Sequence, residues 1–210
     1  MKIKFQNKAS IIVAVGFNLL LVACSPEKKE APLFEMLNAE KTGIQFENRL
    51  HPNEQFNMFH YMYYYNGAGV GVGDFNKDGK MDIFFASNEG ANQLYLNKGN
   101  LKFENSTTAA HIPQDSAWNT GVSIIDINND GLLDIYICRL GNFEKFKDKN
   151  QLLVCQEIKN GLPIYKDEAQ AYGLDFSGFS TQASFFDYDM DGDLDVFIFG
   201  ITFTMFLCLK

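Results

Sequence analysis

The segment GVGDFNKDGKMDIFFA at residues 71–86 occurs again as SIIDINNDGLLDIYIC at 123–138 and as SFFDYDMDGDLDVFIF at 184–199. The three segments align without a gap. In each, apolar residues alternate before an acidic turn and form a continuous run after it, a pattern typical of two strands joined by that turn. An Asn-Gln-Leu strand follows in the first two units, at 92–94 and 150–152. With the Gly turn and aromatic segment after it, each unit is expected to contain about four strands.

A four-stranded sheet of this size cannot cover both of its own faces, so neighbouring units are expected to stack. Radial stacking of such sheets gives a β-propeller. The sequence thus predicts an all-β protein whose β-propeller blades are four-stranded antiparallel sheets, with repeats at residues 66–115, 118–175 and 179–210, the last incomplete. Because a closed ring needs about four to eight blades, about three blades predict an incomplete ring, a fragment of a larger propeller.

The acidic turns carry the chemistry, because each one fits D-x-[DN]-x-D-G-x-x-D. Oxygens at positions 1, 3 and 5 converge when the loop curls, and Gly at position 6 permits the sharp bend. Position 7 can offer its backbone carbonyl, and position 9 adds a carboxylate from the next strand. Such hard oxygen ligands suit Ca²⁺ better than Mg²⁺, which prefers a tight, water-rich octahedron. The predicted ligands are Asp74, Asn76, Asp78, Lys80 and Asp82 in the first turn, Asp126, Asn128, Asp130, Leu132 and Asp134 in the second, and Asp187, Asp189, Asp191, Asp193 and Asp195 in the third.

Two other interpretations of these turns fit less well. A solvated acidic β-turn would explain one such segment but not three at matching positions. An EF-hand requires Glu at position 12, where this chain has Phe85, Ile137 and Ile198. The third turn has five acids and no base and should bind the cation most tightly. The first should be weakest, because Lys77 and Lys80 offset its acids.

The three turns, together with NQLYLNKG at 92–99, resemble FG-GAP or VCBS-type repeats. They are most similar to the cartilage-acidic-protein-like (ASPIC/UnbV) group of exported proteins. The resemblance covers about residues 34–200, within a repeat region of 34–210. It implies a calcium-stabilised propeller, often of seven blades, that serves as a binding or adhesion surface without catalysis.

The N-terminus has the features of a bacterial export signal. Lysines precede an apolar run at residues 11–23 that is too short to span a bilayer, and Leu-Val-Ala-Cys ends it. Leu-Val-Ala-Cys resembles a bacterial lipobox, and this resemblance implies that residues 1–23 are a lipoprotein signal peptide and that Cys24 is lipidated. Residues 24–33 are expected to form a tether. These features place the protein in the bacterial cell envelope, as an outer-membrane lipoprotein facing the periplasm or the surface. A plain signal peptide is the alternative.

Composition limits the partners. The chain has 26 Asp and Glu against 18 Lys and Arg, a net charge of −8, so no nucleic acid partner is expected.

The alternating glycines at 67–73 indicate close strand packing rather than phosphate binding. The aromatic stretch FNMFHYMYYYN at 56–66 is expected to be a half-buried strand, with sugar binding as the alternative. Cys138, Cys155 and Cys208 are expected to be free, buried thiols.

Two functions are compatible with these features. The favoured one is an exported, lipid-anchored, Ca²⁺-binding propeller protein that serves as a binding or adhesion scaffold for a protein or glycan. The alternative is the propeller portion of an envelope carbohydrate-active enzyme whose catalytic part is missing from this chain. No catalytic residues are assigned, because nearly every clustered acid is already a predicted metal ligand.

Overall fold

The computed structural model describes residues 32–143, 146–200 and 204–207. The expected signal peptide, the predicted lipidation site Cys24 and the third cysteine, Cys208, lie outside the described residues. The chain divides into two compact units, Met1–Met36 and Leu37–Lys210. Of the first unit, only 32–36 are described, and they are exposed and without regular structure. Among the described residues, no helix has both the length and the apolar character needed to cross a membrane.

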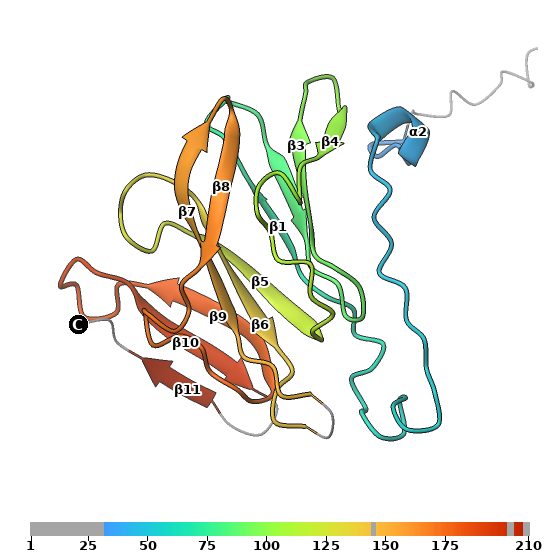
Figure 1. Cartoon of the computed structure of the whole chain (residues 1–210), viewed down its shortest axis with the longest axis vertical. Coiled ribbons are helices and arrows are strands. Elements are labelled where there is room, and N and C mark those ends of the chain that lie inside the picture. The colour runs from blue at the N-terminus through green and yellow to red at the C-terminus, as the bar shows by residue number, and fades with distance from the viewer. Residues whose placement is uncertain (1–31, 144–145, 201–203, 208–210) are drawn as a thin grey trace, which may run out of the picture. The chain divides into compact units, whose positions relative to one another are not determined.

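The described residues of the second unit form three antiparallel sheets, which follow one another along the chain (Figure 1). Their strand orders are β1-β2-β3-β4, β5-β6-β7-β8 and β11-β10-β9. The first sheet consists of β1 (Val70–Gly73), β2 (Asp82–Phe85), β3 (Gln93–Asn97) and β4 (Phe103–Asn105). The second consists of β5 (Asn119–Ile125), β6 (Asp134–Arg139), β7 (Gln151–Lys159) and β8 (Leu162–Asp167), and the third of β9 (Ser180–Phe186), β10 (Asp195–Gly200) and β11 (Thr204–Leu207).

This architecture confirms the all-β class and the four-stranded antiparallel repeat. Each acidic turn joins the first and second strand of its sheet, so strands and not helices flank it, as expected. The described residues form no closed ring. The number of blades in a complete propeller and the fragment status of the chain therefore stay predictions.

The first strands of the three sheets run side by side in the same direction. A Cβ added to Gly69 would lie 2.6 Å from the backbone nitrogen of Val122, and one added to Gly71 would lie 2.5 Å from Ile124 Cδ1. The Ser123 hydroxyl in turn donates to the backbone carbonyl of Ala183, at 2.6 Å. Close strand packing is thus the reason for the glycines in β1. Each acidic turn follows one of these strands. Because β1, β5 and β9 run in the same direction, all three acidic turns lie at the same end of the sheets, where these strands finish.

Two apolar interfaces hold the sheets together. The strand β6 is buried on both faces, because alternate side chains point to opposite neighbours. Ile135 and Ile137 face the first sheet, and Tyr136 and Cys138 face the third. The first interface contains Phe84, Leu94, Leu96, Ile135, Ile137 and Leu153, and the second contains Tyr136, Leu152, Val154, Ala183, Val196 and Ile198.

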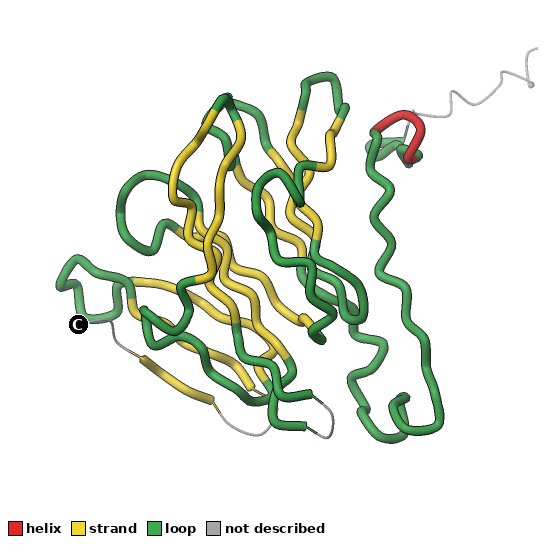
Figure 2. Tube along the Cα trace, viewed as in Figure 1, coloured by secondary structure: helices red, strands yellow, loops and turns green. Residues whose placement is uncertain are grey.

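The outer face of the first sheet contacts the irregular segment that precedes it (Figure 2). Phe46 stacks on Phe85 with ring centroids 4.7 Å apart, and the amide of Gln45 donates to the Tyr95 hydroxyl. The short helix α2 (Ala39–Thr42) ends in Gly43, which has a left-handed backbone with φ of 83°. The corresponding turn after β8 ends in Gly173, with φ of 68°. The segment before the first sheet and the segment after β8 therefore end in the same left-handed glycine conformation.

The prediction of a strand at 56–66 is wrong. These residues form turns, and the stretch folds back so that Phe56, Tyr61 and Tyr64 cluster around Trp118. Phe59, by contrast, is 90% exposed. A strand and an aromatic turn can have the same amino-acid composition, so composition does not distinguish them in this stretch. The contact with Trp118, more than fifty residues away in the sequence, favours the turns. The expectation of free, buried thiols is confirmed for Cys138 and Cys155, and burial raises their pKa to about 12 and about 11.

Candidate metal centre

The first residue of each acidic turn organises the backbone of that turn. Asp74 accepts hydrogen bonds from the amides of Asp78 and Gly79, at 3.0 and 2.8 Å. The same bonds recur in the other two turns. The glycine at position 6 has a left-handed backbone in all three, with φ of 83°, 80° and 98°. A side chain would be strained there, which explains the Gly in the motif. These glycines are Gly79, Gly131 and Gly192.

The last aspartate of each turn is buried at the start of the second strand. Asp134 is fully buried, and its carboxylate accepts from the amides of Ile127 and Cys155 at 2.9 and 2.8 Å. Asp82 accepts from Phe75 and Asn97 in the same way. One carboxylate therefore fixes both the turn and the third strand of the sheet.

These buried carboxylates carry charge that no base offsets. None of the ion pairs among the described residues includes Asp82, Asp134 or Asp195. Burial raises the pKa of Asp134 to about 6, although two amides donate to it, and burial also raises the pKa of Asp82. A cation beside these groups would remove this cost, because it favours the ionised form.

The third turn brings three carboxylates together. Oxygens of Asp187, Asp189 and Asp195 all lie within 4.8 Å of one another, with the first two exposed and the last buried. Desolvation and the charges of Asp191 and Asp195 raise the pKa of Asp189. Asp191 instead accepts from the amide of Asp193, at 3.2 Å, which lowers its pKa. Positions 1, 3 and 9 thus converge here, whereas positions 5 and 7 lie outside this group of three.

The two lysines expected to weaken the first turn act at different places. Lys80 pairs with Asp78 in its own turn, with Nζ 2.9 Å from Oδ2, and this contact lowers the pKa of Asp78. Lys77 instead extends to the second turn, where a Cβ on Gly131 would lie 3.2 Å from its Nζ. The expectation that both lysines offset the first turn is therefore corrected. One lysine lies at each of the first two turns, so the net charges of these two turns differ less than the sequence indicated.

All predicted metal-ligand positions occur on these three turns, and they offer only oxygen. The first two turns replace one carboxylate with the amide oxygen of Asn76 or Asn128, which accepts from the amide two residues later at 3.2 Å. Carboxylate, amide and carbonyl oxygens are the ligands that Ca²⁺ takes. The residues present therefore fit a calcium ion, with the third turn offering the most negative charge.

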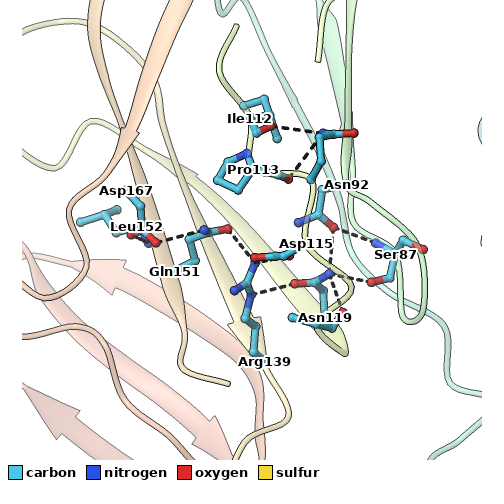
Figure 3. Close-up of polar contacts among 12 residues, drawn as sticks. Ser87, Asn92, Ile112, Pro113, Asp115, Asn119, Arg139, Gln151, Leu152 and Asp167 are labelled. Carbon is cyan, nitrogen blue, oxygen red and sulfur yellow. Dashed lines mark hydrogen bonds and ion pairs between the residues drawn. The ribbon is translucent and has the colours of Figure 1, made fainter. Parts of the chain in front are cut away.

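A second polar region lies at the opposite end of the sheets. Arg139, at the end of β6, is buried and donates from Nε to Asn119 Oδ1 at 2.9 Å and from Nη2 to Gln151 Oε1 at 2.8 Å (Figure 3). It also pairs with Asp115 at 3.0 Å. Asn119 then donates to Asn92 Oδ1 of the preceding sheet. This network joins the first and second sheets through polar groups.

Beside the network is a cavity of about 570 Å³, whose walls include His51, Glu89, Asp115 and Phe146. Glu89 accepts from the His51 amide at 2.8 Å and from the Tyr64 hydroxyl at 2.9 Å. Sequence patterns did not indicate this region, because its residues come from four separate loops. One signal was available: Arg139 is one of only two arginines and follows a continuous apolar run.

Residues 61–137 match the FG-GAP-like repeat family. This span contains the first two acidic turns, with the strands on either side of each. Over this span, the chain is similar to FG-GAP-like repeats. The family grouping predicted from the sequence is thus confirmed, and the third acidic turn lies outside the matched span.

Among the curated relatives of this chain are cartilage acidic proteins. The chain is 27% identical over 136 residues to cartilage acidic protein 1 of Homo sapiens, which covers 63% of the chain and 20% of that protein. It is 28% identical over 141 residues to the protein of the same name from Xenopus tropicalis, covering 67% and 20%. The chain spans about one fifth of the length of the curated relatives that it matches.

Proposed function

We propose that this chain is a calcium-stabilised β-propeller-type scaffold that binds a protein or glycan and has no catalytic role. The observation that carries the proposal is the buried aspartate at the end of each turn, Asp82, Asp134 and Asp195, which has no base to offset its charge among the described residues. Three turns of one geometry at one end of the sheets favour a structural role for the cation. The FG-GAP-like family match supports a repeat scaffold.

The cation would act by joining each turn to its sheet. Bound Ca²⁺ would contact the exposed carboxylates of the turn and the buried carboxylate that accepts from the third strand. Extracellular calcium modules bind with a Kd of about 10⁻⁴ to 10⁻³ M. At about 10 mM free Ca²⁺, each occupied turn would then add about 1 to 3 kcal/mol to the free energy of unfolding.

Export and lipid anchoring complete the proposal. The Leu-Val-Ala-Cys segment supports lipidation of Cys24, which would hold the domain on a bacterial envelope membrane by a polar tether. Metabolic labelling with a fatty acid tests this step. Wild-type chain should carry the label and Cys24→Ala should not, while label on both would exclude this anchor.

The test of the metal proposal is thermal unfolding of metal-free protein, with Ca²⁺ or Mg²⁺ added back. Ca²⁺ should raise the melting temperature more than Mg²⁺ does. Asp187→Ala should lose more of this rise than Asp74→Ala, because the third turn has more acids and no base. Glu54→Ala, an exposed acid outside the turns, is the matched control and should keep the full rise. A melting temperature that Ca²⁺ leaves unchanged would refute the proposal, and equal losses in the two Asp variants would refute the order.

A further inference from the structure

A second, smaller cavity lies where the first strands of the three sheets begin, at the end opposite the acidic turns. Its volume is about 190 Å³, and it lies between the segment before β1 and the starts of β5 and β9. Residues from all three sheets or their leading segments line it: Tyr61, Tyr63, Asn66, Trp118, Thr120 and Thr181. It therefore depends on the stacking of the three sheets.

Two tyrosines form an aromatic wall of this cavity. The rings of Tyr61 and Tyr63 are 5.8 Å apart and inclined at 59°. Tyr61 is almost fully buried, whereas Tyr63 is 37% exposed and can contact a ligand without disturbing the core. The hydroxyl groups of both tyrosines make no hydrogen bond to any described residue, so both remain able to bond a ligand.

The indole N–H of Trp118 is a hydrogen-bond donor on a nearly buried side chain. It is 1% exposed, and its indole N–H donates to none of the described residues. Asn92 Nδ2 is the only fully buried side-chain polar atom without a partner in the described part of the chain. The Trp118 indole nitrogen therefore keeps some access to solvent, and Trp118 lines this cavity. A donor with this little exposure is satisfied only when water or a ligand accepts from it.

The chemistry of the walls specifies the kind of ligand. Every lining side chain is uncharged at neutral pH, and the walls combine amide, hydroxyl and indole groups with aromatic rings. An ion would find no opposite charge, and a purely apolar ligand would leave the indole N–H without an acceptor. A ring with an apolar face and a rim of hydroxyl groups satisfies both requirements. The volume is below the roughly 300 Å³ of the smallest ordinary ligand pockets and fits one such ring.

We propose that this cavity is a saccharide subsite, in which Tyr63 packs on the face of one neutral sugar ring and the Trp118 N–H donates to a ring hydroxyl. The proposal rests on the proposed binding function and narrows it to a neutral glycan. The larger cavity beside Glu89 and Asp115 is excluded as this subsite, because its carboxylates already accept from His51, Tyr64 and Arg139.

The test uses the single tryptophan of the chain as a reporter. Its indole N–H gives one resonance in a nitrogen-correlated NMR spectrum of the full chain. The probes are the methyl glycosides of glucose, galactose, mannose and N-acetylglucosamine, each titrated to about 50 mM, since one sugar ring should bind with a Kd of about 1 mM. At least one glycoside should shift the indole resonance to saturation.

Three variants distinguish binding in the cavity from binding elsewhere on the surface. Tyr63→Ala should weaken glycoside binding about tenfold, and Trp118→Phe should weaken it about fivefold. Because Trp118→Phe has no indole resonance, its binding is measured by saturation-transfer NMR signals of the glycoside. Tyr65→Ala, an exposed neighbour outside the cavity, should stay within about twofold of wild type. A resonance that no glycoside moves, or equal affinity in wild type and Tyr63→Ala, would overturn the proposal.

The calcium response of the same samples keeps the two proposals distinct. Ca²⁺ stabilisation without any glycoside effect would refute the subsite alone. Glycoside binding without Ca²⁺ stabilisation would support the subsite and refute the metal proposal. Retained Ca²⁺ stabilisation in Tyr63→Ala also shows that the variant is folded, so that lost glycoside binding counts in favour of the subsite.

Discussion

Metal-free protein should become more stable as the pH falls from 7 to 4, and Asp134 is the main cause. Its pKa is about 6 in the folded protein, against an ordinary value of 3.8. The folded state therefore holds this proton more tightly than the unfolded state does, and protonation favours folding throughout this range. The stabilisation is fully present below pH 4 and is lost as the pH rises through 6.

The size of the effect follows from the two pKa values. Between pH 7 and pH 5, protonation of Asp134 alone should add about 1 kcal/mol to the free energy of unfolding, and between pH 7 and pH 4 about 2 kcal/mol. Saturating Ca²⁺ should reverse the trend. The cation offsets the buried charge at pH 7, and protons compete with it in acid, so the Ca²⁺-loaded protein should lose stability as the pH falls.

The assay is urea unfolding of metal-free protein, followed by tryptophan fluorescence at pH 7, 5 and 4. Asp134→Asn keeps one acceptor oxygen and cannot titrate. Relative to this variant, wild type should gain about 2 kcal/mol between pH 7 and pH 4. Glu54→Gln, an exposed acid, should follow wild type. If the difference between wild type and Asp134→Asn is the same at every pH, Asp134 carries no buried charge and no cation is needed to offset it.

Three further outcomes follow from single contacts. Lys80→Gln should raise the Ca²⁺ affinity of the first turn several-fold, and Lys77→Gln that of the second, since their ammonium groups lie at those turns; calorimetry showing Lys77→Gln acting only on the first turn would contradict this assignment. Arg139→Met should cost about 3 kcal/mol in urea unfolding, because Asn119 and Gln151 would lose a buried donor, and a loss under about 1 kcal/mol would be too small for that network. Gly69→Ala should cost at least about 2 kcal/mol, because its Cβ would collide with backbone of β5, and an unchanged melting temperature would mean that β1 and β5 are not in contact.

Short-range patterns predicted the repeated parts of this protein correctly. The alternation before Asp126 and the apolar run after it predicted β5 and β6, because side chains alternate between faces in a strand. Gly131 marked a bend that needs a left-handed backbone. These features depend on residues at most a few positions apart, so one sequence suffices to find them.

Patterns failed where one segment meets another from a different repeat. The aromatic stretch 56–66 has the composition of a strand but forms turns around Trp118. The effect of Lys77 on the second turn also escaped prediction, because the position of a flexible ammonium depends on how neighbouring sheets stack.

The repeat, the position of every acidic turn and the oxygen chemistry of those turns are properties of local sequence, since the predicted ligands of each turn lie within nine consecutive residues. The two cavities at the opposite end, the Arg139 network and the placement of Trp118 are properties of the stacked sheets. Their residues are drawn from segments of different repeats, and no spacing rule relates them. Packing alone brings them together, because the apolar faces of successive sheets must cover one another before these loops can meet.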